Sequence, residues 1–394
     1  MQKKLITTAV LTAFAAPVAA TAADGAGSST VQVFGTLWLE YAVNVKQGRS
    51  AVPGAGDLST ADFLQATPYS EIGIKGEERL GGGLSAWYQC ATTADLRGES
   101  QNGWCSRNSA LGLKGGFGSA YIGNWDTPFK RTATATMVSG NELGVWAPTF
   151  LLFGDATTDA VGANRASFRK RQNNSINYDS PNFGGVQVLG MFSSSQPSTG
   201  TLNNATNNKP RVWSLGAQYS AGPLYVSGAY EEHRDYAGAA GPGSSKDRGW
   251  HVGAAYTWGP VRFGGLYTRQ KFDVVGGDVT AKAWHAGVDW TIAGPHGLKA
   301  SYTQAGNMSG VAGAIVGTPS GAGYRPAPTP GMDTGARLYA VRYIYNFSKR
   351  TEFDAGYVRL HNDSGAAYNL GGLNAQHANG ERQSAWAFAM RHSF

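Results

Sequence analysis

The chain has 394 residues, with 33 Lys and Arg against 26 Asp and Glu, which gives a formal net charge of +7. Gly is frequent at 55 residues, Cys is limited to 2, and only 15% of the residues are charged. A modest positive balance without clusters of Lys and Arg gives little support to nucleic-acid binding. Beyond the first segment, no apolar run reaches the roughly 18 residues that a membrane-spanning helix needs, so the sequence argues against a helical membrane protein.

Residues 1–22 have the pattern of a secretory signal peptide. A charged start, MQKK, precedes an apolar stretch from Leu5 to about Val18, and Ala-Thr-Ala at 20–22 provides a cleavage site. The apolar stretch is too short to span a bilayer, and the cleavage site argues against a permanent anchor. We therefore expect an exported protein whose single mature domain covers residues 23–394.

The next segment, VQVFGTLWLEYAVNV at 31–45, alternates between apolar and polar residues. Its odd positions, from Val31 to Val45, are mostly large and apolar, whereas its even positions include a Gln, a Thr, a Glu and an Asn. This period of two predicts a strand with one apolar face and one wet face. The alternation recurs at 250–258 and 284–292. Strands of about 10–13 residues exceed the usual soluble length and fit tilted transmembrane strands.

Short and long connections alternate along the chain. Seven short, tight links occur at 80–83, 115–118, 181–185, 220–223, 258–260, 293–297 and 346–351. Eight long polar segments fill the other gaps, near 46–67, 96–105, 127–167, 195–210, 236–247, 273–279, 307–334 and 363–381. Together they separate sixteen strands and put both termini on the short-turn side. We therefore predict an all-β fold: a closed, 16-stranded antiparallel transmembrane β-barrel with short periplasmic turns and long extracellular loops.

Several blocks resemble the general-diffusion porins of Gram-negative bacteria, most closely those of the beta-proteobacteria. They are YSEIGIKGEERLGGGLSAWYQC (69–90), ALGLKGGFGSAYIGNWDTPF (110–129), NSINYDSPNFGG (174–185), YNFSKRTEFDAGYVRLHN (345–362) and the closing RHSF. The resemblance runs from about Val31 to Phe394. It implies a trimeric, water-filled channel in the outer membrane for passive diffusion of small hydrophilic solutes and ions, with the third extracellular loop folded into the lumen.

The long link at about 127–167 is the candidate for that loop. Loops of this length in compact proteins are usually functional or disordered. It carries its own apolar cluster around Trp146 and Phe150–Phe153, which needs a surface to pack against. We expect it to pack on the inner wall of the barrel, and the alternative is that it covers the rim or a subunit contact.

A constriction is expected where this loop faces charged residues on the wall. The expected wall residues are Arg107, Arg169, Arg171, Glu71 and Lys75. The expected acidic partners in the long link are Asp126 at its base, Glu142, Asp155 and Asp159. The resemblance supplies Arg107 and Arg171, whereas the other residues are chosen from strand parity or from their charge alone. The alternative for each of these residues is an ordinary solvated side chain.

Carboxylates that face guanidiniums across a narrow gap create a transverse field, which favours polar solutes and tunes ion selectivity. Glu71 stands where many relatives carry a wall arginine, and this weakens the inference of a strongly positive wall. Arg262, Arg342, Arg391 and Lys299 also have lumen-facing parity. We therefore expect only weak anion selectivity.

Cys90 and Cys105 flank the second long loop in a protein expected in an oxidising compartment. One possibility is a disulfide that braces the loop, and the other is two unpaired thiols.

The final segment, SAWAFAMRHSF at 384–394, alternates in the same way. Counted back from Phe394, large side chains share one face and Arg391 shares the other with two alanines. We expect this sixteenth strand to pair with 31–45 and close the barrel. An aromatic end such as Phe394 resembles the signal that the outer-membrane assembly machinery recognises.

Enzymatic functions find little support. The seven His residues are scattered, and the sequence has no metal-ligand spacing, no Gly-x-Ser-x-Gly motif and no phosphate-binding loop. We expect no catalytic residue, no cofactor and no metal site. Expected partners are two further copies of the chain, outer-membrane lipid and lipopolysaccharide, and the assembly machinery, with no nucleic acid. The alternatives are a substrate-specific channel, an adhesin-like barrel or a lipase barrel.

Overall fold

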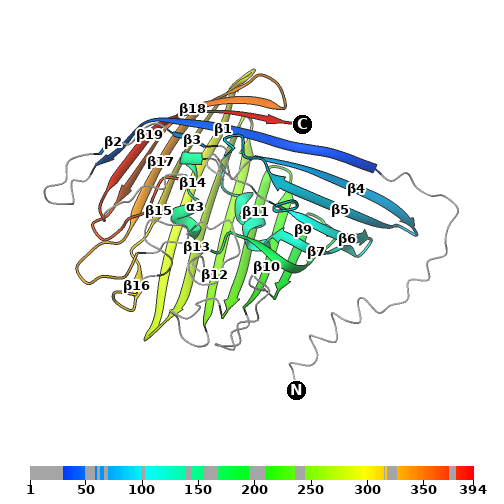
Figure 1. Ribbon diagram of the computed structural model, residues 1–394, viewed down its shortest axis with the longest axis horizontal. Coiled ribbons are helices and arrows are strands. Elements are labelled where there is room, and N and C mark those ends of the chain that lie inside the picture. The colour runs from blue at the N-terminus through cyan, green and yellow to red at the C-terminus, as the bar shows by residue number, and fades with distance from the viewer. Residues whose placement is uncertain are drawn as a thin grey trace.

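A computed structural model describes residues 30–48, 58–59, 63–65, 70–98, 103–138, 144–154, 167–194, 210–235, 245–314, 316, 326–371 and 379–394. The predicted signal peptide lies outside these residues. Within them, one sheet closes into a barrel, and α3 lies inside the ring of strands (Figure 1). No helix in the described ranges is long and apolar enough to cross a membrane.

Sixteen long strands form the barrel wall in the described part of the chain. They are β1 (Thr30–Gly48), β4 (Glu71–Gly81), β5 (Leu84–Thr93), β6 (Ser109–Gly115), β7 (Gly118–Asp126), β8 (Arg171–Asp179), β9 (Val186–Ser193), β10 (Arg211–Ala221), β11 (Leu224–Arg234), β12 (Lys246–Trp258), β13 (Val261–Val274), β14 (Gly277–Ala293), β15 (His296–Ala305), β17 (Ala336–Asn346), β18 (Thr351–Asn362) and β19 (Arg382–Ser393). The short strands β2 (Leu58–Ser59), β3 (Phe63–Gln65) and β16 (Ser309–Gly310) lie in long connections. The long link after β7 contains α2 (Pro128–Thr134), the 3-10 helix η1 (Gly144–Trp146) and α3 (Thr149–Phe153).

The seam between the two ends of the chain closes the barrel. β1 pairs antiparallel with β4 on one side and with β19 on the other, so the predicted pairing of the terminal strand is confirmed. The amide and carbonyl of Gly35 bond to the carbonyl and amide of Phe394 at 3.1 and 3.0 Å. A Cβ at Gly35 would come within 2.5 Å of the Phe394 ring, so the ring needs a glycine opposite it.

The seven short links are tight turns at one end of the barrel, as predicted. Glycines with positive φ make several of them possible, for example Gly222 at 53° and Gly259 at 56°. The prediction of a long connection at 273–279 is wrong. β13 and β14 pair as far as Val274 and Gly277, so only two residues link them. Val and Gly there continue the ladder, so the hairpin extends where a long loop was expected.

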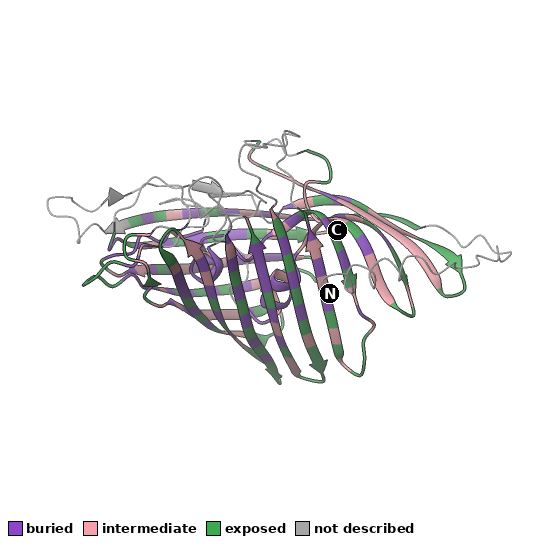
Figure 2. Cartoon of the chain, turned by 90° about the horizontal axis from the view of Figure 1, so that it is seen from below, coloured by how far each residue is buried: buried purple, intermediate pink, exposed green. Residues whose placement is uncertain are grey.

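Buried and exposed residues alternate along many of the strands (Figure 2), as expected when successive side chains point to opposite faces of the wall. On β12, Trp250 and Val252 are exposed, whereas His251 between them is buried. The alternation predicted that Val45 shares the apolar face of Val31, which is exposed. This prediction is wrong, because Val45 is fully buried. Asn44 has a φ of 50° at a register shift between β1 and β19, and the extra residue of this β-bulge turns Val45 inward.

Candidate functional site

The chain turns into the barrel directly after β7. Thr127 caps α2 by accepting a hydrogen bond from the Lys130 amide at 3.2 Å, and Pro128 occupies the first turn, where a missing N–H costs nothing. Phe129 is fully buried. The sequence Thr-Pro-Phe therefore ends the strand, starts a helix and aims an aromatic anchor at the wall.

Polar side chains of the inner wall hold α2. The Ser214 hydroxyl of β10 accepts from the Phe129 amide at 3.1 Å, and the Ser227 hydroxyl of β11 donates to the Thr132 carbonyl at 2.9 Å. Nε2 of His251, on β12, lies 3.1 Å from the Phe129 carbonyl and 3.0 Å from the Thr132 hydroxyl. Three adjacent strands thus meet the backbone of one short helix.

Inward-facing glycines give α2 and the residues after it room to approach. A Cβ at Gly216 would lie 3.1 Å from the Thr132 methyl, and one at Gly253 would lie 2.6 Å from the Thr136 hydroxyl. At Gly264 it would overlap the Thr136 carbonyl. At these positions on β10, β12 and β13 the absence of a side chain lets the segment pack closely against the wall.

Further contacts carry the segment across the barrel. Nε2 of His285, on β14, lies 3.2 Å from the Val138 carbonyl, and Arg262 of β13 donates to the Ala135 carbonyl at 3.0 Å. Gln270 donates to the Leu152 carbonyl of α3 at 2.8 Å. The described parts of 127–154 therefore contact the wall from β10 to β15.

At the seam, a buried charged cluster receives η1. The Glu40 carboxylate of β1 accepts from the Val145 amide at 3.0 Å. Arg342 of β17 lies with its guanidinium 5.4 Å from the centre of the Trp146 ring and 3.2 Å from the Asp354 carboxylate of β18. Glu40, Arg342 and Asp354 are all buried, so η1 shields these charges from water.

Two expected wall arginines form close ion pairs. Arg107 lies 2.6 Å from the Glu71 carboxylate, so the acidic wall residue directly neutralises its neighbour. Arg171 lies 3.4 Å from Asp126, which also accepts from Lys130 at 2.9 Å. These charges meet in contact pairs beside the base of the long link. In both pairs the charge of the arginine is therefore balanced by a carboxylate in direct contact with it.

The parity argument for β8 does not extend along the whole strand. Ile176 is exposed and Asn177 is buried, as their parity predicts. Asn174, however, has a φ of 49° at a register shift between β7 and β8, so Arg169 and Arg171 are out of phase with the residues used to place them. Arg169 is buried, with 4% of its surface exposed.

Of the other expected site residues, Lys75 is described by the structure and three loop acids are not. Lys75 lies with its ammonium group 5.1 Å from the centre of the Phe34 ring. Glu142, Asp155 and Asp159 fall outside the described residues, so the acidic side of the expected field is represented there by Asp126 alone among the four.

Arg131 was missed by the sequence reasoning. Its two terminal nitrogens donate to the Asp179 carboxylate at 2.8 and 2.7 Å, and one also donates to the Tyr121 hydroxyl at 3.0 Å. Burial opposes the charge, but the bonds to Asp179 outweigh it and hold the pKa of Arg131 above its usual range. Here the loop supplies the cation and the wall supplies the anion. The signal available in the sequence was the basic pair in PFKRT.

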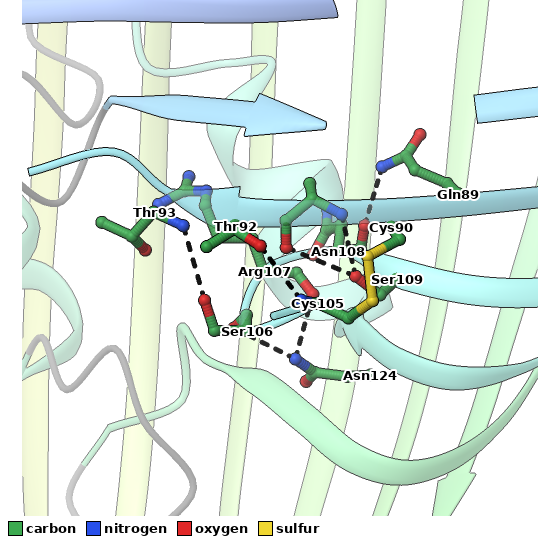
Figure 3. The surroundings of a disulfide bond; sticks show 11 residues. Gln89, Cys90, Thr92, Thr93, Cys105, Ser106, Arg107, Asn108, Ser109 and Asn124 are labelled. Carbon is green, nitrogen blue, oxygen red and sulfur yellow. Dashed lines mark hydrogen bonds between the residues drawn. A yellow bond between two sulfur atoms is a disulfide. The ribbon is translucent and has the colours of Figure 1, made fainter. Parts of the chain in front are cut away.

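A disulfide joins Cys90 of β5 to Cys105 in the next long connection, with Cα atoms 4.7 Å apart (Figure 3). Next to it, the Cys105 amide donates to the Thr92 hydroxyl at 3.0 Å and the Arg107 amide donates to the Ala91 carbonyl at 2.9 Å. The bond therefore holds residues 105–107 against β5, and this position brings Arg107 to Glu71. The 15-residue separation is short, and closing it adds about 3 kcal/mol in the chain-entropy account.

Comparisons with known proteins agree with this architecture. A sequence model of the family described as Gram-negative porin matches residues 7–366. The major outer membrane protein P.IB of Neisseria meningitidis serogroup A is 30% identical over 240 residues, which cover 60% of this chain and 61% of that protein. The chain thus spans about three fifths of the length of the curated relatives it matches.

Solved structures share the fold at low sequence identity. The anion-selective porin from Comamonas acidovorans has a TM-score of 0.72 at 21% identity, covering 93% of this chain and 100% of that chain. OmpT of Vibrio cholerae, folded in vitro in a trimer form, has a TM-score of 0.63 at 15% identity, covering 93% of this chain and 100% of that chain.

Proposed function

The chain belongs to the Gram-negative porin family, and from that premise we propose that it forms a water-filled channel in the outer membrane for small hydrophilic solutes and ions. The observation that carries the proposal is a closed barrel, apolar outside and polar inside, crossed by a segment that the inner wall holds at many points. Such a segment narrows the passage through the barrel but leaves the barrel wall unchanged. The charged side chains around it suit hydrated solutes better than apolar ones.

Weak anion selectivity is the second part of the proposal. Several charges on the inner face of the described wall lie in ion pairs, as in Arg107 with Glu71 and Lys299 with Asp289. Arg262 is different: it is exposed on the inner face and, although Asp289 lies opposite it in the strand register, it forms no ion pair within the described residues. A guanidinium on the pore wall without a contact ion pair attracts anions and repels cations.

Replacing Arg262 with Gln is expected to shift the zero-current potential of a planar bilayer, held in a KCl gradient, toward cation selectivity. The matched control is Arg269→Gln, which removes the same charge from the outer face of the same strand and should leave the potential unchanged. Cation selectivity of the unmodified channel would contradict the proposed sign. Conductance that saturates with one class of solute would instead favour a substrate-specific channel.

The assembled channel is proposed to be a homotrimer. The outer faces of β1, β4 and β6 carry exposed aliphatic residues such as Val31, Ile72 and Leu111, which suit burial against another copy. The trimer form of OmpT, a structural neighbour, supports the same stoichiometry. The mass of the detergent-solubilised complex, measured with the detergent contribution subtracted, tests it.

Export and assembly complete the proposal: removal of residues 1–22 as a signal peptide, and recognition of Phe394 by the assembly machinery. Phe394→Ala is expected to reduce the amount of folded protein in the outer membrane severalfold, because the ring that covers Gly35 at the seam is lost. Met390→Ala is the control, since Met390 is also exposed on the outer face of β19. Equal amounts of the two variants would contradict a special role for Phe394.

A further inference from the structure

A row of hydrogen-bonded side chains crosses the inner wall at the short-turn ends of β8 to β11. The Tyr225 hydroxyl of β11 donates to the side-chain carbonyl of Gln218, on β10, at 2.9 Å. The Gln218 amide group donates to the side-chain carbonyl of Gln187, on β9, at 2.8 Å. The Gln187 amide group donates to the Ser180 backbone carbonyl, directly after β8, at 3.1 Å. Each of these side chains is therefore held in place by its neighbour.

The row faces the lumen. Tyr225 shares a face of β11 with Ser227, and Gln218 shares a face of β10 with Ser214. Both serine hydroxyls bond to the backbone of α2, which lies inside the barrel. The two glutamines of the row and its tyrosine are each partly exposed. Because both serines are farther from the short turns, the row lies on the short-turn side of the segment that narrows the passage.

Aromatic rings continue this surface toward β5. The Tyr121 ring of β7 and the Trp87 ring of β5 have their centres 5.1 Å apart, and both residues pair with Gly112 of the strand between them. The Tyr121 hydroxyl accepts from Arg131 of α2, which also holds the carboxylate of Asp179 at the end of β8. Trp87 is partly exposed and Tyr121 is buried. The indole of Trp87, supported by Tyr121, therefore borders the row of polar groups.

The combined surface carries no net charge. Its members, called here the neutral strip, are Trp87, Tyr121, Arg131, Asp179, Gln187, Gln218 and Tyr225. Arg131 and Asp179 neutralise each other at 2.7 Å, and the nearby Lys114 and Glu77 also form an ion pair. Arg262 lies two strands beyond the end of the strip, on β13. Amides, phenols and paired charges offer donors and acceptors to a solute without selecting for its charge.

We infer that the neutral strip is a weak binding subsite for uncharged saccharides. This inference rests on the proposed function, because the solute must reach the strip through a water-filled passage. A pyranose ring has an apolar face of C–H groups, which can stack on an aromatic ring, and a rim of hydroxyl groups that donate and accept. The Trp87 indole suits the apolar face, whereas the glutamine amides, the Tyr225 hydroxyl and the ion pair of Arg131 suit the hydroxyl groups.

The geometry of the strip sets the expected affinity and size of the ligand. From β7 to β11 it covers four strand spacings, about 19 Å along the wall, which leaves room for more than one sugar ring. Its side chains are already ordered by their own hydrogen bonds, so binding costs little conformational entropy. The strip contacts a solute from one side only, however. We therefore expect a dissociation constant on the order of 1 mM or weaker, which leaves the passage open to other solutes.

The test measures how an uncharged trisaccharide, maltotriose, interrupts the ion current of channels in planar bilayers at fixed KCl. Its dissociation constant follows from how the current blockades depend on maltotriose concentration. The variant Tyr225→Phe/Gln218→Leu removes a hydroxyl and an amide from the strip. The matched control, Tyr302→Phe/Gln304→Leu, removes the same hydrogen-bonded pair, at 3.2 Å, from the outer face of β15, where Tyr302 lies opposite the exposed Tyr339. Maltotriose is expected to bind the strip variant about 10-fold more weakly than the unmodified channel, and the control within a factor of about two.

Three results would overturn the inference: unchanged blockade of the strip variant, an equal loss in the control, or equal blockade of the unmodified channel by polyethylene glycol of the same mass. The last result would show obstruction by size alone. If the double variant does not assemble, Tyr225→Phe is compared with Tyr302→Phe, and a roughly threefold weakening is expected only for the first. A channel that conducts ions but is not blocked by maltotriose would contradict the subsite and leave the proposed channel standing. Absence of ion conductance in the unmodified protein would contradict both.

Discussion

Replacing Arg342 with Met is expected to lower the free energy of unfolding by about 3–5 kcal/mol. The Arg342 side chain is 1% exposed and the Asp354 side chain is fully buried, so the substitution leaves a carboxylate without its cation in a dry site. It also removes the guanidinium from the Trp146 ring that η1 places against it. Urea unfolding in detergent, followed by tryptophan fluorescence, measures the change.

The control for this prediction is Arg391→Met. Arg391 of β19 pairs with Glu352 of β18 at 2.8 Å, but the Arg391 side chain is 42% exposed, so water still reaches the pair and the loss of Arg391 should cost at most about 1 kcal/mol. The double change Arg342→Met/Asp354→Leu should recover much of the stability, since neither buried charge remains. Equal losses at Arg342 and Arg391 would show that burial of the pair is not what matters.

Replacing Gly264 with Val is expected to lower single-channel conductance. The new side chain would occupy the space of the Thr136 carbonyl and the Val138 methyl groups, so the segment after α2 must move away from the wall and toward the pore axis. Overpacking of this kind costs about 1–3 kcal/mol, which the closed wall can tolerate. Conductance in planar bilayers at fixed salt measures the effect.

Gly265→Val provides the matched control. Gly265 follows Gly264 on β13 and pairs with the outward-facing Ala286, and a Cβ there would meet only the His285 carbonyl, at 3.3 Å. Its conductance should equal that of the unmodified channel. A folded Gly264→Val channel with unchanged conductance would show that the segment does not limit the passage.

Repetition made the barrel predictable from the sequence. Alternating rows, Gly- and Pro-containing links and their even spacing fix the strand count, because each strand must turn one face to lipid and the other to water. Parity fails at single residues with positive φ, such as Asn44 and Asn174, where an asparagine in an otherwise regular strand gives only a weak signal of a bulge.

The interior was harder to predict, because its pairs join residues far apart in the chain. Arg131 with Asp179 and Glu40 with Val145 depend on the path of the segment through the barrel, which residue types do not specify. Composition pointed to acids in the long link and bases on the wall. In the described residues, the helix of that link brings a cation to a wall carboxylate.

The continuous ladder from β1 through β19 and back to β1 has a consequence for how permeability can vary. Every wall strand is bonded on both sides, so its circumference is set by the number of strands and cannot widen locally without breaking a row of backbone bonds. Changes in what passes must therefore come from side chains and from the inner segment. Substitutions such as those at Gly264 and Arg262 can therefore change conductance or ion selectivity while the strand pairing of the barrel wall stays the same.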